Sequence, residues 1–352
     1  MKKLSFIANI AAAVLASVLF IGTAAYGETN AARPAASYTE PAARRTVVPC
    51  GTPFGIKMLT DGVMVTDFGA VNGRLSQQSP AEAAGIRKGD IVTSVNGVGI
   101  TDSLSVSSAV QLDPKCTICV IREGKELTFT ANALRSDTDG EYKLGMWTKD
   151  SVAGIGTMTY YDPETERFAG LGHGISDTGT GVRMPLLKGE ITAVTITDVI
   201  RGSSGCPGEL CGAFISSVEI GTITGNNDFG VFGVCTAAPI LAEPVEIASK
   251  DEVKTGRAVI LATIGGMTPK EYDIEIVSID RSETSSTRNM TIRVTDPNLL
   301  SHTGGIVQGM SGSPIIQNGR LAGAVTHVLV NDSAMGYAVF AENMANAAEL
   351  TE

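Results

Sequence analysis

The pattern of apolar and polar positions divides the chain into four segments. Residues 1–27 begin with two lysines close to the N-terminus and continue as an almost uninterrupted apolar run. Residues 28–50 show no hydrophobic periodicity and are rich in Ala, Pro, Thr and Arg. In residues 51–134 short apolar runs are interspersed with two helix-like stretches, and residues 135–352 are a succession of short apolar runs separated by Gly, Asp and Asn. We therefore expect a leader, a linker, a small mixed domain and a large β domain.

The first segment is long enough, at roughly 20 apolar residues, to cross a bilayer as a helix. It also ends in the small residues GTAAYGE, which are typical of a cleavable signal peptide. The sequence does not distinguish a transmembrane anchor from a cleaved signal, but both leave the charged end inside and export the rest of the chain. We therefore expect an exported protein, membrane-anchored or secreted, with an exposed linker over residues 28–50.

Residues 51–134 carry the local signals of a small α+β domain. An Asp-Gly pair at 61–62 separates two apolar runs in the manner of a hairpin turn. Ser79 is a candidate helix N-cap, Pro80 fits the first helical position, and Glu82 completes a capping box. The strand IVTSVNG then turns at Asn-Gly, SLSVSSAVQLD is typical of a second helix, and TICVIREGKELTFTANAL of a hairpin.

This domain resembles a PDZ domain, and the resemblance rests on the strings SPAEAAGIRKGDIVTSVNGVGI and FGIKM. In PDZ domains of exported proteases a loop of the second kind offers backbone N–H groups to a peptide C-terminus or to an extended segment, which joins the edge of the sheet. The resemblance assigns this peptide-binding role to Phe54, Gly55, Ile56 and Lys57. A packing module without a ligand is the alternative that the residues leave open.

Residues 135–352 predict a mainly β domain. The stretch AGIGTMTYYDPETERFAGLGHGISD is typical of a hairpin that closes at Asp162-Pro163-Glu164, and ten or so further short strands follow. Strands at this spacing indicate a sandwich or a pair of barrels. A single helix, AENMANAAELTE, is expected to close the chain.

Composition narrows the class of partner. A net charge of −10, with no basic run apart from the N-terminal lysine pair, argues against nucleic acid, because phosphate binding requires a basic face. Among the six cysteines, Cys206 and Cys211 lie in a glycine-rich loop and could pair in an exported chain. The single CxxC motif, Cys116 to Cys119, does not predict a metal site. We expect neither a metal nor a cofactor.

Ser311, in the string GMSGSPII, is a candidate nucleophile. Gly309 stands two residues before it and Gly312 directly after it. A serine hydrolase needs a base beside this hydroxyl and a group that orients the base. His173, in the turn GLGHGISD, is the candidate base, and Asp296, where a strand ends before a proline, is the candidate acid. The order His, Asp, Ser is that of the chymotrypsin group, in which the N–H groups of Gly309 and Ser311 would form the oxyanion hole. The competing assignments are Asp177 or Asp332 as the acid and His302 as the base, with His327 lining the substrate pocket.

These motifs make the chain similar to the SpoIVB peptidase family, serine peptidases of spore-forming Firmicutes. The resemblance covers nearly the whole chain and rests on KLGMWTKDSVAGIGTMTYYDPETERFAGLGHGISD, on TGGIVQGMSGSPIIQNGRLAGAVTHVLVND and on GYAVF. It implies a PDZ domain followed by a chymotrypsin-like double β-barrel. It also implies that His173, Asp296 and Ser311 are the catalytic residues, with Asp296 carried by the shortest motif.

The resemblance further implies an exported serine endopeptidase that acts in the space between forespore and mother cell. Members of the family cleave a membrane-associated regulator, which frees an intramembrane protease to mature a late sigma factor. They also cleave themselves near the N-terminus, with the PDZ domain in self-recognition and substrate binding. The alternative is a catalytically inactive PDZ scaffold that only binds peptides. An adhesive surface protein held by disulfides or metal has no supporting motif, and the sequence determines neither the cleavage-site preference nor the oligomeric state.

Overall fold

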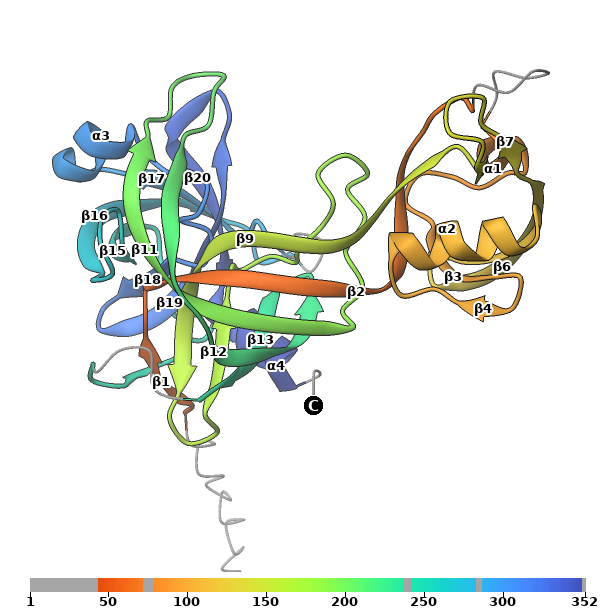
Figure 1. The fold of residues 1–352 in the computed structure, drawn as a ribbon. Helices are drawn as coiled ribbons and strands as arrows, with labels where there is room; N and C mark the ends of the chain where they lie inside the picture. The colour runs from red at the N-terminus through yellow and green to blue at the C-terminus, as the bar shows by residue number, and fades with distance from the viewer. Residues whose placement is uncertain (1–43, 72–78, 237–241, 283–286, 350–352) are drawn as a thin grey trace, which may run out of the picture. The chain divides into compact units, whose positions relative to one another are not determined.

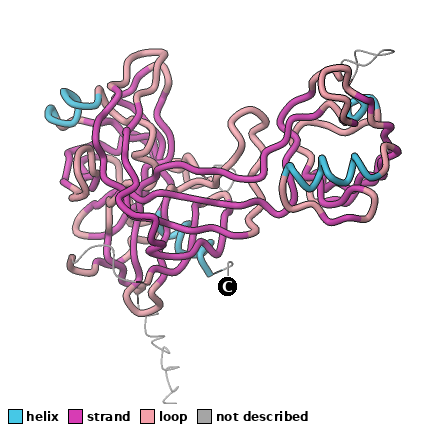
Figure 2. The backbone as a smooth tube through the Cα atoms, in the orientation of Figure 1, coloured by secondary structure: helices cyan, strands magenta, loops and turns pink. Residues whose placement is uncertain are grey.

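The computed structural model describes residues 44–71, 79–236, 242–282 and 287–349, which all belong to one compact unit. The predicted signal or anchor over residues 1–27 lies outside these residues, as does most of the predicted linker. Among the described helices, none combines the length and the apolar character that crossing a membrane requires. Strands dominate and helices are few and short (Figure 2), as the apolar pattern predicts.

Six strands pair in a closed cycle that we call the first barrel (Figure 1). Each strand pairs with the next in antiparallel fashion, and the last returns to the first. Its core contains Phe54 and Phe168, whose rings meet edge to face at 5.9 Å. In order around the cycle, the strands are β2 (Pro53–Phe68), β9 (Met146–Asp162), β10 (Arg167–Gly170), β13 (Gly230–Cys235), β12 (Glu209–Asn227) and β11 (Lys188–Ile200).

The C-terminal half of the chain forms a second closed barrel. A core of branched aliphatic residues fills it, including Ile260, Ile292 and Ile315, each fully buried. Helix α3 (Pro297–Thr303) follows one of its strands, and α4 (Ala341–Glu349) ends the described chain where the sequence predicts a terminal helix. Its strands in spatial order are β15 (Gly256–Ala262), β16 (Lys270–Ile279), β17 (Met290–Val294), β20 (Asp332–Phe340), β19 (Arg320–Leu329) and β18 (Pro314–Gln317).

The PDZ module has the predicted local structure. Ser79 caps α1 by accepting a hydrogen bond from the Glu82 N–H at 3.2 Å. Asn96 and Gly97 both have positive φ, as a two-residue hairpin turn requires. The module comprises α1 (Pro80–Ala83), α2 (Ser103–Leu112), β3 (Ile91–Val95), β4 (Val98–Gly99), β5 (Lys115–Arg122), β6 (Lys125–Asn132), β7 (Leu134–Arg135) and β8 (Tyr142–Lys143).

The module is inserted between two strands of the first barrel and does not precede the peptidase as a separate block. Strand β2 begins between β9 and β11 of the barrel and continues into the module, and β9 returns from it (Figure 1). The core of the module draws on residues from Val63 to Leu144, whereas the sequence predicts boundaries at 51 and 134. The predicted turn at Asp61-Gly62 is instead a bulge within β2, where the Thr60 hydroxyl donates to Gly62 O and Asp150 O.

The end of the predicted linker is also wrong, because residues 46–49 form a buried strand. Strand β1 (Thr46–Pro49) pairs with β9 on one side and with β14 (Val245–Glu246) on the other. Val47 is completely buried. A four-residue apolar segment is too short for its periodicity to be recognised in a sequence rich in Ala and Pro.

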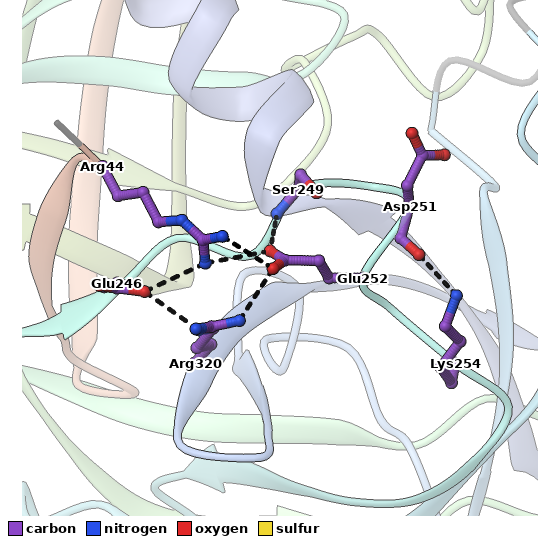
Figure 3. Close-up of polar contacts among 7 residues, drawn as sticks. All are labelled: Arg44, Glu246, Ser249, Asp251, Glu252, Lys254 and Arg320. Atoms are coloured by element: carbon purple, nitrogen blue, oxygen red, sulfur yellow. Dashed lines mark hydrogen bonds and ion pairs between the residues drawn. The ribbon is translucent and has the colours of Figure 1, made fainter. Parts of the chain in front are cut away.

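Charged residues hold the segment that enters β1 (Figure 3). Arg44 contacts the carboxylates of Glu246 and Glu252, and Arg320 of β19 contacts the same two groups. Two arginines thus alternate with two carboxylates, and the network joins β1 and β14 to the second barrel.

Candidate active site

The structure brings His173 and Ser311 to one cleft, a cavity of about 780 Å³. The cleft has walls from both barrels: Val152 and Ile155 of β9 on one side, and the loop before β18 together with β19 on the other. His173 follows β10 of the first barrel, and Ser311 precedes β18 of the second. Two residues far apart in the sequence therefore face the same space.

A strained turn presents His173. Leu171 and Gly172, the two residues before it, both have left-handed φ values of 67° and 69°, and the Gly172 N–H donates to Gly170 O at 2.9 Å. A leucine in this region is uncommon and costs roughly 1 kcal/mol or more. The buried Leu171 side chain and the bond from its N–H to Thr157 O hold the turn in place.

The imidazole of His173 is set up as a neutral base. Its Nδ1 lies 2.9 Å from Gly174 O. Because a carbonyl oxygen only accepts, Nδ1 carries the proton and Nε2 is left unprotonated. Burial lowers the pKa of His173, and the hydrogen bond to Gly174 offsets part of that shift. The ring is therefore available to take a proton at neutral pH.

Two consecutive tight turns shape the loop that carries Ser311. The Met310 N–H donates to Val307 O, and the Ser313 N–H donates to Met310 O. Gly309 and Gly312 occupy the third positions of these turns with φ of 93° and 97°. A Cβ on Gly312 would lie 1.9 Å from Thr157 O, so only glycine fits there.

The predicted oxyanion hole has free donors. Neither the Gly309 N–H nor the Ser311 N–H donates a hydrogen bond within the part of the chain that the structure describes. The Ser311 hydroxyl itself donates to Thr326 O of β19 at 2.7 Å. Attack on a carbonyl requires this hydroxyl to turn from Thr326 toward a base.

His327 of β19 also lines the cleft, as the sequence predicts for it. Its ring lies 4.8 Å from the ring of His173, centroid to centroid. Its Nδ1 is buried and has no hydrogen-bond partner among the described residues. Burial, followed by the nearby His173 and Arg288, lowers the pKa of His327 to about 4, so it stays neutral beside His173.

Asp296 does not lie in this cleft. It is the N-cap of α3, where its Oδ1 accepts from the N–H groups of Asn298 and Leu299 at 2.8 and 3.0 Å. It lines a different cavity of about 460 Å³ together with His302, the competing base. An Asp-Pro pair after a strand is a strong helix start, and this local preference decides where the carboxylate goes.

The other candidate acids are engaged elsewhere. Asp177 lines the cleft, but its carboxylate binds Lys149 and the backbone of its own loop. Asp332 accepts from the Ala334 N–H at the start of β20. Among the described residues, no carboxylate is hydrogen-bonded to His173, and Gly174 O takes the position opposite Nε2.

The predicted peptide-binding segment lies in the barrel. Phe54, Gly55, Ile56 and Lys57 pair with β9 on one edge and with β11 on the other, so no peptide can add to either edge. Phe54 and Ile56 are buried. The string FGIKM has the apolar-Gly-apolar pattern of a PDZ ligand loop. The same pattern is also typical of a closely packed strand, which is what these residues form.

The module has a groove at another place, a cavity of about 530 Å³ between α2 and residues 142–148. Leu144, Gly145 and Met146 form an apolar-Gly-apolar string at its end, and Val106 and Val110 of α2 line its wall. No hydrogen bond from the N–H of Leu144 or Gly145 is found within the described ranges. Leu144-Gly145-Met146 was therefore the sequence signal for a peptide-binding loop. It lies after residue 134, the predicted end of the PDZ domain.

Comparison with known families agrees with this architecture. A family model described as SpoIVB peptidase S55 matches residues 140–345, and a PDZ-domain model matches residues 54–132. The chain belongs to the SpoIVB peptidase family. This SpoIVB-family protein is a serine peptidase with a PDZ domain, and its fold is mainly β.

Solved structures of other proteases are distantly similar. The Rv3671c protease from M. tuberculosis, in its active form, is 19% identical over 55% of this chain and 72% of that chain, with a TM-score of 0.34. The HtrA-type protease AlgW, solved with a decapeptide, is 12% identical over 61% of this chain and 55% of that chain, also with a TM-score of 0.34. No curated protein matches the chain.

Asn226 is a residue of this SpoIVB-family protein that sequence reasoning did not single out. Its side-chain amide donates to Ile175 O and Met184 O and accepts from the Ile175 N–H, so it holds the base of the loop that follows His173. An asparagine in a glycine-rich strand carries no signal of such a role.

The cysteines remain thiols in the structure. Cys206 is exposed and Cys211 is half-buried, and both are free, so the pairing considered for them is not formed. No group of three or more His, Cys, Asp or Glu side chains suited to a metal occurs among the residues described.

Proposed function

We propose that this SpoIVB-family protein is a serine endopeptidase in which Ser311 is the nucleophile and His173 the general base. The observation that carries the proposal is that His173 and Ser311, which follow β10 and precede β18 in different barrels, line one cleft. A nucleophile on a glycine-shaped loop, a neutral imidazole and free backbone donors are the parts that acyl transfer requires.

The proton path follows from the ring's hydrogen bond. Nδ1 is held by Gly174 O, so Nε2 takes the Ser311 proton as the hydroxyl attacks and later returns it to the leaving amine. The N–H groups of Gly309 and Ser311 stabilise the oxyanion. A neutral carbonyl in place of a carboxylate stabilises the imidazolium less, so we expect the free enzyme to be a slow protease.

The substrate is a protein segment. We assign peptide docking to the groove beside α2, where an extended segment adds to the edge at residues 144–148. Family membership supports a membrane-anchored regulatory protein as the substrate, and cleavage of the chain's own N-terminal region, in sporulation signalling that activates a late sigma factor. The apolar segment over residues 1–27 supports export to the space between forespore and mother cell.

Covalent labelling tests the proposal. Purified wild type and Ser311→Ala are incubated with a fluorophosphonate probe, and N-terminal fragments are identified by mass spectrometry. We expect labelling and fragments in wild type alone, with the same thermal melt for both proteins. Equal cleavage by the Ser311→Ala protein removes the assignment.

An inactive PDZ scaffold is the second candidate, and one observation favours it. The Ser311 hydroxyl is hydrogen-bonded to Thr326 O and not to His173. A scaffold with this arrangement would bind peptides in the groove and leave the probe unreacted, so the same labelling experiment separates the two functions.

A further inference from the structure

The loop that follows His173 is a small hairpin built around Asp177. Ser176 and Arg183 form its bridge, and the Asp177 N–H donates to Val182 O at 2.9 Å. The Asp177 carboxylate is almost completely buried, with 4% of the side chain exposed. Its Oδ2 accepts from the N–H groups of Gly179 and Thr180 and from the Thr180 hydroxyl. The carboxylate therefore determines the shape of the hairpin that begins at His173.

The other carboxylate oxygen of Asp177, Oδ1, forms an ion pair with a lysine of a different element. Lys149 of β9 donates from Nζ to Asp177 Oδ1 at 2.7 Å. This bond from Lys149, more than any other contact, lowers the pKa of Asp177 against the opposing effect of burial. The Thr180 hydroxyl also contacts Met64 Sδ of β2 at 3.7 Å. The hairpin is thus tied to the two strands that connect the first barrel with the PDZ module.

The neighbours of Lys149 on β9 are bound to the wall of the PDZ groove. Ser103, at the start of α2, shares a hydroxyl–hydroxyl hydrogen bond of 2.9 Å with Thr148. The Ser103 N–H donates to Asp150 Oδ2 at 3.0 Å. Ser103 and Thr148 both line the groove. Hydrogen bonds therefore tie α2 to Thr148 and Asp150, and Lys149, between these two residues on β9, is bound to Asp177.

The strand ladder is interrupted at this same place. Leu59 pairs with Ser151 and Met64 with Lys149, so four residues of β2 bulge opposite a single residue of β9. A bulge interrupts the regular ladder, bends the strand and increases its local twist. Lys149 therefore lies where the ladder between β2 and β9 is locally broken.

We propose that Lys149 and Asp177 are positioning residues for His173 and that the PDZ groove acts on the active site through them. The proposal rests on the proposed function, because it concerns the reactivity of Ser311 with His173 as its base. A segment bound beside α2 would shift residues 148–150. The ion pair between Lys149 and Asp177 would transmit this shift to the hairpin, and the imidazole of His173 would turn toward the Ser311 hydroxyl.

Lys149→Met is the principal variant for the test. It removes the charge and keeps the length, and the carboxylate of Asp177 retains its three other donors, so the chain is expected to fold. The measurement is the rate constant for fluorophosphonate labelling of Ser311 in the full chain, with a thermal melt of each protein. We expect a loss of about tenfold, because small misplacements of a catalytic group already cost this much rate. Lys149→Arg, which keeps the cation, should restore most of the lost rate.

Lys254→Met is the matched control, since in the described part of the chain the exposed Lys254 Nζ donates only to Asp251 O and the residue lines neither the cleft nor the groove. It should label like wild type. A wild-type rate for Lys149→Met, or a failure of Lys149→Arg to restore the rate, overturns the positioning role. A wild type that does not label at all refutes the proposed function, and the inference falls with it.

A double-mutant cycle tests the link to the groove. Asp102 caps α2, so Asp102→Ala loosens the helix start that carries Ser103. We expect it to slow labelling in wild type and to have no further effect in the Lys149→Met protein. Independent, multiplying effects, or no effect of Asp102→Ala in wild type, contradict transmission through Lys149.

Discussion

At the scale of single residues, the position of Asp296 is decided by its own backbone surroundings. It stands before a proline and two further residues whose N–H groups need an acceptor, and its carboxylate binds two of these N–H groups. A helix N-cap gains about 1 kcal/mol from such bonds. His173, by contrast, is oriented by Gly174 O, so its tautomer is determined without a carboxylate. The sequence order His, Asp, Ser does not reveal this difference.

Asp296→Asn separates the two roles of this residue. Asparagine caps helices as well as aspartate does, so we expect a nearly unchanged melting temperature and a labelling rate of Ser311 within a few-fold of wild type. In a triad the same change costs about 10⁴-fold. A loss of that size would show that Asp296 reaches His173 in the active enzyme.

At the scale of elements, the arginines directly before strand β1 hold it in place. Arg45 donates two hydrogen bonds to Asp162 Oδ2, at 3.2 and 2.9 Å, and Asp162 has only 5% of its side chain exposed. Burial opposes the charged form of Asp162, but the bonds from Arg45 and the Glu164 N–H outweigh it and lower its pKa. Arg44 lies in an exposed network with Glu246 and Glu252 (Figure 3).

Two neighbouring arginines should therefore differ in their effect on stability. Arg45→Met leaves a buried carboxylate without its cation and should lower the free energy of unfolding by about 2 kcal/mol. Arg44→Met should change it little, because exposed ion pairs are screened by solvent. Urea unfolding at neutral pH measures both. Equal effects of the two substitutions would contradict this account of β1.

At the scale of the whole molecule, the PDZ module and the peptidase share two strands. Strand β2 supplies one edge to β9 and the other to β11, and it stands before the module in the sequence. A peptidase domain that starts after the module, as the sequence predicts with residues 135–352, lacks one of six strands of its first barrel. The two parts cannot be separated by a single cut.

Fragments test this arrangement. Residues 135–352 alone should fail to show a cooperative thermal transition, because β9 and β11 would each have an open edge and the core would lose Phe54 and Ile56. A chain from residue 44 with residues 61–148 replaced by a short turn should fold, as judged by circular dichroism. A cooperative melt of the 135–352 fragment would refute the insertion.

Local features were predictable because they depend on neighbours in the chain. The N-cap at Ser79, the Asn96-Gly97 turn, the terminal helix and the glycine-shaped loop at Ser311 all arise from interactions over a few residues. The family motifs around His173 and Ser311 correctly indicated a SpoIVB-type serine peptidase. The start of the module core at Val63 and the place of its groove beside α2 were not predictable, because a strand that serves two sheets has one continuous apolar pattern.

The sequence by itself determined the family, the mainly β class and two residues, His173 and Ser311, that line one cleft. Only the tertiary structure decided which groups surround them: Gly174 O at the base, Thr326 O at the nucleophile and Asp177 bound by Lys149. The physical reason is the separation along the chain over which each kind of interaction acts. Turns and caps follow from contacts between near neighbours, whereas the partner of a buried polar group is whatever atom a distant strand brings within hydrogen-bond distance.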